Sequence, residues 1–161
     1  MDLLGNKLVV VAPGGSKLSA VALERDALVS ANRTQSSCYW RGQFGANWTV
    51  VTSALEKLGF WADIQPRLAA IRECACVTAL VARGEAALGI VYETDAKAEP
   101  RVNVVLTFPD ETHPPIIYPF TLTVSAKGEA PARFLAFLRT EPARKVFTPQ
   151  GFTVPRLRIT Q

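Results

Sequence analysis

Tyr92 is the side chain of this sequence best placed for ligand chemistry. It ends the run Leu88-Gly89-Ile90-Val91-Tyr92, whose apolar residues predict a short buried strand. Thr94 or Asp95 can cap a short helix after it. Ligands of open α/β sheets gather at the carboxyl ends of strands, where a tyrosine hydroxyl is a neutral hydrogen-bond donor. The alternative is a half-buried aromatic ring with its hydroxyl in water.

The cysteines and the single histidine are the other reactive side chains. Cys74 and Cys76 contain thiols of the kind that bind zinc, and Cys38 or His113 would complete such a site. However, cysteines two apart on a helix point to different faces, which argues against a shared metal ion. A nucleophilic enzyme that uses Cys74, His113 and Asp110 has suitable residue types. His113 lies in the stiff connector Thr-His-Pro-Pro, which favours a structural role. We therefore expect no metal centre and no catalytic residues.

Two further patterns are weak. Asp110 and Glu111 are carboxylates that could exchange protons, but adjacent side chains rarely converge, so a solvated turn is favoured. The Gly14-Gly15-Ser16 segment follows an expected strand as a phosphate-binding loop does. It lacks the Lys-Ser/Thr ending and the spacing of such loops, so we expect a surface turn.

Composition narrows the classes of function. The chain has 161 residues, 48% of them hydrophobic and 20% charged, as in one globular domain. Its net charge of +4 comes from scattered cations, which predicts no nucleic-acid surface. No apolar run reaches the roughly 18 residues of a membrane span, so no direct membrane insertion is expected. The first residues lack the pattern of a signal peptide, so the chain as written is expected to be cytoplasmic. Three cysteines make no disulfide framework.

The elements that must position these residues alternate along the chain. We expect strands over residues 7–12, 88–92, 102–108 and 116–124. We expect helices over 20–30 (with Ser19 as N-cap), ending near Gly59 and Gly84, and over 130–138 and 142–147. This alternation predicts a mostly parallel, doubly wound sheet. Residues 31–52 fit neither a helical nor a strand period.

One set of segments agrees in order and spacing with a known family along nearly the whole chain: residues 3–13, 54–61, 66–69, 79–96, 107–119 and 147–152. Each segment alone is weak, but together they resemble the periplasmic molybdate-binding proteins, the substrate-binding components of molybdate ABC transporters. The resemblance implies a periplasmic-binding-protein type II-like α/β fold, essentially one doubly wound lobe plus the C-terminal helices of the other lobe. The doubly wound lobe would cover residues 1–124. Residues 125–161 would be helices and a tail that pack on the missing first lobe.

The resemblance also implies a function. The ligand would be molybdate or tungstate, bound without a cofactor and without catalysis. The Tyr92 hydroxyl and the backbone N–H groups of Asn47 and Cys74 would bind the anion, since they occupy the family's ligand positions. The protein would be periplasmic and would serve an ABC permease in the inner membrane.

The sequence departs from the family pattern in three places. The opening lobe with its two serine-bearing anion loops is absent. Asn47 stands where the family has a Val-Pro-Ala-Gly loop, and Cys74 stands at the valine of a Glu-Asn-Val-Arg helix start. Only Tyr92 matches a family ligand by residue type. We therefore expect impaired molybdate binding, and the alternative is a non-binding remnant or interaction module with no ligand.

Both altered patches share a possible origin. Back-translated and read one nucleotide later, residues 43–50 permit Asn-Ser-Val-Pro-Thr-Gly-Arg, and residues 72–77 permit Glu-Asn-Val-Arg-Ala. Both results restore family motifs at the expected positions. Our hypothesis is that residues 33–52 and 71–77 are shifted-frame translations, which the nucleotide sequence of the gene tests directly.

Overall fold

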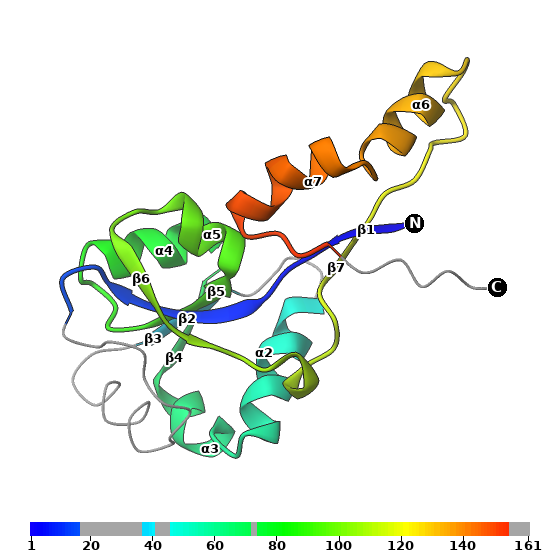
Figure 1. The fold of residues 1–161 in the computed structure, drawn as a ribbon. Coiled ribbons are helices and arrows are strands. Elements are labelled where there is room, and N and C mark those ends of the chain that lie inside the picture. Colours follow the sequence, from blue (N-terminus) through cyan, green and yellow to red (C-terminus); the bar gives the residue numbers. More distant parts are fainter. Residues whose placement is uncertain (17–36, 41–45, 72–73, 155–161) are drawn as a thin grey trace. The chain divides into compact units, whose positions relative to one another are not determined.

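The computed structural model describes residues 1–16, 37–40, 46–71 and 74–154. Contacts divide the chain into two units (Figure 1). We call Lys7–Pro114 the sheet unit, and Met1–Asn6 together with Pro115–Gln161 the terminal unit. The contacts group residues 115–124 with the C-terminal part because a strand there pairs with the first strand of the chain. The expected lobe boundary at residue 124 stays a prediction.

The sheet unit contains a five-stranded sheet of order β4-β3-β5-β2-β6. Its strands are β2 (Leu8–Pro13), β3 (Ser37–Trp40), β4 (Leu68–Ile71), β5 (Gly89–Tyr92) and β6 (Val102–Thr107). β3 is parallel to β4 and β5, whereas β2 is antiparallel to β5 and β6. The three strands expected in this unit are confirmed. The mostly parallel sheet is confirmed for β3, β4, β5 and β6, which run in one direction, but β2 runs against them, so the sheet is mixed. Buried strands of either direction have the same apolar composition, so the pattern does not record direction.

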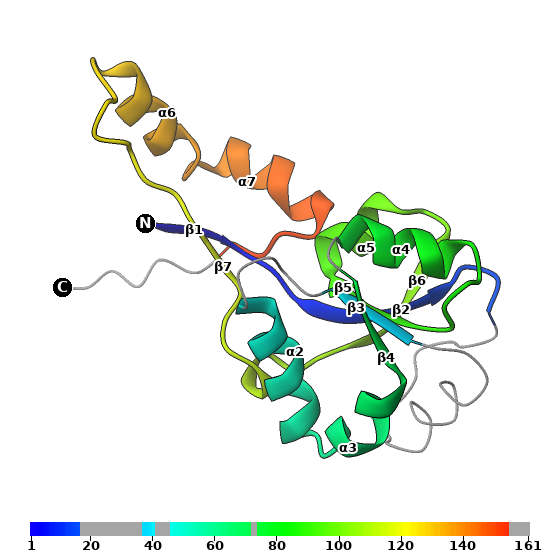
Figure 2. The same cartoon turned by 180° about the vertical axis from the view of Figure 1, so that it is seen from behind.

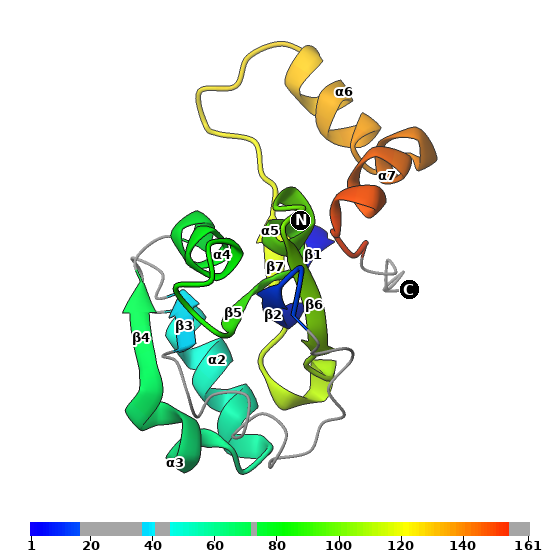
Figure 3. The ribbon, with the colours of Figure 1, turned by 90° about the vertical axis from the view of Figure 1, so that its left-hand side faces the viewer.

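Helices cover both faces of this sheet. α2 (Ala46–Lys57) and α3 (Trp61–Ile64) lie on one face, and α4 (Cys74–Ala82) and α5 (Glu93–Ala98) lie on the other, as Figure 3 shows. The connection from β3 to β4 runs toward the outside of the sheet, and the connection from β4 to β5 runs in the opposite direction, toward its centre. Right-handed crossovers in opposite directions place their helices on opposite faces. The short helices η1 (Gln65–Arg67) and η2 (Asp110–Thr112) complete the unit, and the helix expected over residues 20–30 lies outside the described residues.

Valines fill the layer between the sheet and α4. Val9 and Val11 of β2 and Val77 and Val81 of α4 are fully buried in one cluster. Gly89 is required where α4 crosses β5, because a Cβ there would lie 2.9 Å from Val77 Cγ1 and 2.9 Å from Val81 Cγ2. The glycines expected to end two helices are also confirmed, since Gly59 and Gly84 have φ values of 72° and 73°.

The terminal unit joins the two ends of the chain. β1 (Asp2–Gly5) pairs antiparallel with β7 (Ile117–Pro119), and α6 (Ala130–Phe137) leads into α7 (Glu141–Phe147) and η3 (Thr148–Gln150), as Figure 2 shows. The two expected helices are confirmed, and the strand expected over residues 116–124 is much shorter. The Phe152 ring packs edge-on against Tyr118 and Phe147, with centroid distances of 5.6 and 6.0 Å. Within the described part of the chain, no helix has the length and apolarity that a membrane span requires.

Candidate functional site

Tyr92 lies where the sequence predicts it, at the carboxyl end of a buried strand. It is the last residue of β5 and the N-cap of α5, with an extended backbone (φ −81°, ψ 153°). It is buried, and it pairs with Leu8 of β2. The prediction that Thr94 or Asp95 caps the helix is wrong, because both lie inside α5. The strand passes into the helix without intervening turn residues, so the cap falls on the tyrosine.

Three helices begin at the carboxyl edge of the sheet. By this we mean the end of the sheet where β3, β4 and β5 have their carboxyl ends and where Tyr92 lies. β3, β4 and β5 are parallel, with Trp40 opposite Ile71 and Tyr39 opposite Ile90, so their carboxyl ends share that edge. α2 follows β3, α4 follows β4 and α5 follows β5. Asn47 is the second residue of α2, and Cys74 is the first residue of α4. The topology therefore places the backbone of both residues at the same edge as Tyr92. Their role as ligands stays a prediction.

The charges at these helix starts favour an anion at α2 and α4. The first N–H groups of a helix have no partner within it, and the helix dipole adds partial positive charge there. α2 and α4 have no acidic residue in the first turn. α5 has Glu93 and Asp95 there, and the Glu93 carboxylate lies 4.0 Å from Lys7 Nζ and 3.9 Å from Lys97 Nζ. The starts of α2 and α4 therefore attract a small anion more strongly than the start of α5 does.

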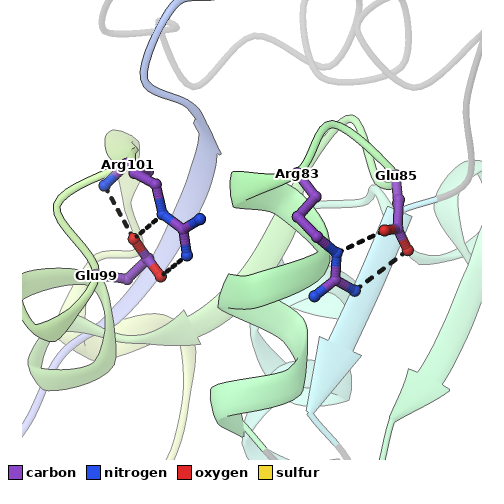
Figure 4. A network of polar contacts seen from close by, with 4 residues as sticks. All are labelled: Arg83, Glu85, Glu99 and Arg101. Carbon is purple, nitrogen blue, oxygen red and sulfur yellow. Dashed lines mark hydrogen bonds and ion pairs between the residues drawn. The ribbon is translucent and has the colours of Figure 1, made fainter.

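Two ion pairs lie at the opposite edge of the sheet, before β5 and β6 begin. Arg83 pairs with Glu85, and Arg101 pairs with Glu99 (Figure 4). Arg101 Nη2 lies 2.7 Å from Glu99 Oε2, and hydrogen bonds from Arg101 hold the Glu99 pKa at about 2. The Glu85 pKa is lowered for the same reason, a hydrogen bond from Arg83. Each arginine thus pairs with its own glutamate, at the opposite end of the strands from Tyr92.

The structure also places the residues of the rejected sites. His113 is buried, and its Nδ1 donates a hydrogen bond to Pro114 O at 2.9 Å, which agrees with a structural role. Asp110 and Glu111 are exposed on η2, as expected of a solvated turn. Gly14 and Gly15 form the expected surface turn, closed by Ser16 N–H donating to Pro13 O at 2.9 Å.

The three cysteines lie on two elements of the sheet unit. Cys38 lies in β3, while Cys74 and Cys76 lie in the first turn of α4. Cys76 is exposed. Among the described residues, no three His, Cys, Asp or Glu side chains form a group that could hold a metal ion.

The sequence of the whole chain agrees with this architecture. The family model for bacterial extracellular solute-binding proteins matches residues 2–153. The chain belongs to this family. The expected family resemblance is confirmed by this match, and the expected fold is confirmed by superposition on solved structures of binding proteins.

Two curated relatives of this solute-binding protein are molybdate-binding proteins named ModA. The one from Haemophilus influenzae is 32% identical over 151 residues, which cover 94% of this chain and 59% of the relative. The one from Escherichia coli is 33% identical over 159 residues, which cover 94% of this chain and 60% of the relative. The chain thus spans about three-fifths of their length. A solved substrate-binding domain, assigned to a molybdenum ABC transporter of Clostridium difficile, superposes with a TM-score of 0.79 at 23% identity, covering 97% of this chain and 66% of that one.

Sequence reasoning missed β3 and the first half of α2. Both fall in the 31–52 stretch that fits no period. One pattern could have extended the helix, because Val50, Val51, Ala54 and Leu55 recur at helical spacing and are all buried. The shifted-frame hypothesis concerns this same stretch, and much of it lies outside the described residues. It remains a hypothesis about the gene.

Proposed function

We propose that this solute-binding protein binds molybdate at the carboxyl edge of β3, β4 and β5. One observation supports the proposal above all. α2 and α4 begin at the edge where Tyr92 lies, and neither has an acidic residue in its first turn. Such helix starts attract anions without any cationic side chain. The names of the curated relatives supply the identity of the anion.

Each donor in this proposal has a separate role. The Tyr92 hydroxyl donates one hydrogen bond to a molybdate oxygen, and backbone N–H groups at Asn47 and Cys74 donate others. The substitutions at these two positions leave backbone N–H groups present, since neither residue is proline. Tungstate has the same charge and tetrahedral shape, so it fits the same donors. The protein acts as a carrier, with no cofactor and no catalytic step.

The wider role follows from the family. A solute-binding protein of an ABC importer delivers its ligand to a permease, so the proposed partner is a permease of the inner membrane. The proposed location is the periplasm. Nucleic acid and direct membrane insertion have no part in this proposal.

We expect weak binding by these 161 residues alone. The chain spans about three-fifths of its curated relatives, and the family resemblance assigns two serine-bearing anion loops to the remainder. An anion bound by the sheet unit alone stays exposed to water on one side. Each missing charge-assisted hydrogen bond costs about 1.5–3 kcal/mol, so two or three of them weaken binding by several orders of magnitude. Millimolar affinity is the expected result.

The test is thermal unfolding of the purified chain with increasing molybdate or tungstate, alongside titration calorimetry. A ligand at ten times its Kd stabilises the folded state by about 1.4 kcal/mol, which shifts the midpoint by several degrees. Tyr92→Phe should reduce this shift. Tyr118→Phe is the matched control, because its hydroxyl accepts a hydrogen bond from Asn6 in the terminal unit.

The outcomes separate the candidate functions. No shift at 50 mM of either oxyanion would exclude molybdate binding and favour an interaction module without a ligand. A micromolar calorimetric isotherm would leave molybdate binding intact and contradict the expected impairment. An equal loss in Tyr92→Phe and Tyr118→Phe would remove Tyr92 from the site.

A further inference from the structure

A group of charged side chains lies next to Tyr92 at the carboxyl edge. Glu93 is the first residue of α5 and directly follows Tyr92 in the chain. Its Oε2 lies 4.0 Å from Lys7 Nζ, and its Oε1 lies 3.9 Å from Lys97 Nζ. The carboxylate therefore lies between two cations, one from the residue before β2 and one from α5 itself. We call Lys7, Glu93 and Lys97 the edge triad.

The main chain holds the edge triad at this end of the sheet. The Glu93 N–H group donates a hydrogen bond to Lys7 O at 3.0 Å. The neighbouring residues pair within the sheet, where Leu8 lies opposite Tyr92. Because β2 is antiparallel to β5, β2 begins where β5 ends. Backbone hydrogen bonds thus keep Glu93 close to Tyr92, in addition to the two lysine side chains.

The Glu93 carboxylate is partly shielded from solvent. Its side chain is 24% exposed, whereas the Lys7 and Lys97 side chains are each 43% exposed. Salt screens a partly buried charge less than an exposed one. Both lysine nitrogens lie beyond ordinary hydrogen-bond distance of the carboxylate oxygens, so they offset the negative charge without forming close pairs with it.

A negative charge at this edge acts on anions according to their own charge. The first turns of α2 and α4 contain no acidic residue, so the acidic residues in the first turns of the three helices are Glu93 and Asp95 of α5. Coulomb energy is proportional to the product of the charges, so one carboxylate repels a dianion twice as strongly as a monoanion at the same place. Neutral donors favour the anion of higher charge, and Glu93 acts in the opposite sense.

We propose that Glu93 sets the charge preference of the anion site, and that Lys7 and Lys97 limit its repulsion of a doubly charged ligand. This inference rests on the proposed function, because it needs an anion at the carboxyl edge. It also widens the class of ligands. Tetrahedral oxyanions with a single negative charge, such as perrhenate, become competitors of molybdate at this site.

The experiment titrates the 161-residue chain and its variants with molybdate and with perrhenate, a tetrahedral monoanion. Amide NMR signals of the sheet unit report millimolar binding, and sodium chloride keeps the ionic strength at about 0.15 M. Glu93→Gln should tighten molybdate binding about two- to fourfold, and perrhenate binding by about the square root of that factor. Glu85→Gln is the matched control. It removes the same charge from an ion pair at the opposite edge, so both affinities should stay unchanged.

The lysines provide a change of opposite sign. Lys7→Met and Lys97→Met should each weaken molybdate binding more than perrhenate binding, and Lys7→Arg should preserve both affinities because it keeps the charge. All these effects should shrink as the ionic strength rises, since salt screens the charges. A loss of folding would affect both anions alike. The lysine variants therefore test the inference even where Glu93→Gln folds poorly.

The outcomes separate this inference from the proposed function. If the unmodified chain binds molybdate, equal changes for both anions or no change in Glu93→Gln would overturn the inference and leave the proposed function intact. An equal gain in Glu85→Gln would show a general effect of net charge and would also overturn it. No signal change with either anion, in the unmodified chain and in Glu93→Gln, would exclude both.

Discussion

Helices of the sheet unit bury their apolar side chains, whereas α6 of the terminal unit exposes large ones. Val9, Val11, Val77 and Val81 of the sheet unit are fully buried between a sheet and a helix. Phe134 and Phe137 on α6 of the terminal unit face solvent. An apolar pattern on a helix therefore does not by itself establish burial, and only the structure shows whether a neighbouring element covers it.

Local preferences explain why α6 forms without a core. Ala130, Ala132 and Ala136 favour the helix, and Pro131 stands in the first turn, where proline is tolerated. Such preferences contribute only tenths of a kcal/mol per residue, whereas burial of a large apolar side chain contributes about 1.5–3 kcal/mol. The two units should consequently differ strongly in their response to mutation.

The largest expected difference is between two phenylalanines. Phe108 is 1% exposed in the sheet unit, and Phe108→Ala should lower the free energy of unfolding by about 3–5 kcal/mol. Phe134→Ala in the terminal unit should change it by less than about 0.5 kcal/mol. Urea unfolding followed by circular dichroism measures both. Similar losses would mean that α6 is covered in solution, and the contrast between the units would fail.

The next effect concerns ligand binding at the sheet unit. Tyr92→Phe keeps the ring that packs at the end of β5 and removes only the hydroxyl. The loss of one hydrogen bond to a charged ligand, about 1.5–3 kcal/mol, should weaken molybdate binding tenfold or more. Phe137→Asp in the terminal unit should leave molybdate binding unchanged. Titration calorimetry of the purified chain and of both variants measures this difference.

A smaller effect tests the packing of α4 on β5. Gly89→Ala places a Cβ 2.9 Å from two valine methyl groups, so overpacking should cost about 1–3 kcal/mol. Gly15→Ala is the matched control, because a Cβ there meets nothing within 4 Å. Measuring the free energy of unfolding of both variants tests this difference. A Gly89→Ala variant as stable as Gly15→Ala would show that α4 is free to move on the sheet.

The smallest effect concerns charge at the edge of the sheet far from Tyr92. Arg101→Ala should raise the Glu99 pKa from about 2 toward its ordinary 4.5, measured by carbon NMR titration. A carboxyl with a lowered pKa stabilises the fold above its unfolded pKa, and this contribution is lost as pH falls from about 4.5 to 2. The Arg101 side chain is exposed, and solvent screens the ion pair, so the loss of stability at pH 7 should be small. Molybdate affinity should stay the same, because the pair lies at the other end of the strands from Tyr92.

Much of the sheet unit was predictable because its strands are continuous apolar runs. The runs ending at Ala12 and Tyr92 are typical of buried strands, and the glycines at 59 and 84 mark helix ends. β3 was missed, since its four residues, Ser-Cys-Tyr-Trp, lack both alternation and an apolar run. The cap of α5 was misplaced because a strand that turns directly into a helix leaves no turn residue to recognise.

The sequence by itself determined the family, the position of Tyr92 at the end of a buried strand and most helix ends, since these depend on residue type and local spacing. Only the tertiary structure decided the antiparallel insertion of β2 between β5 and β6 and the meeting of three helix starts at one edge. It also decided the exposure of α6. These features depend on which segments pair across long distances in the chain, and strand direction and burial by a distant partner leave no local trace.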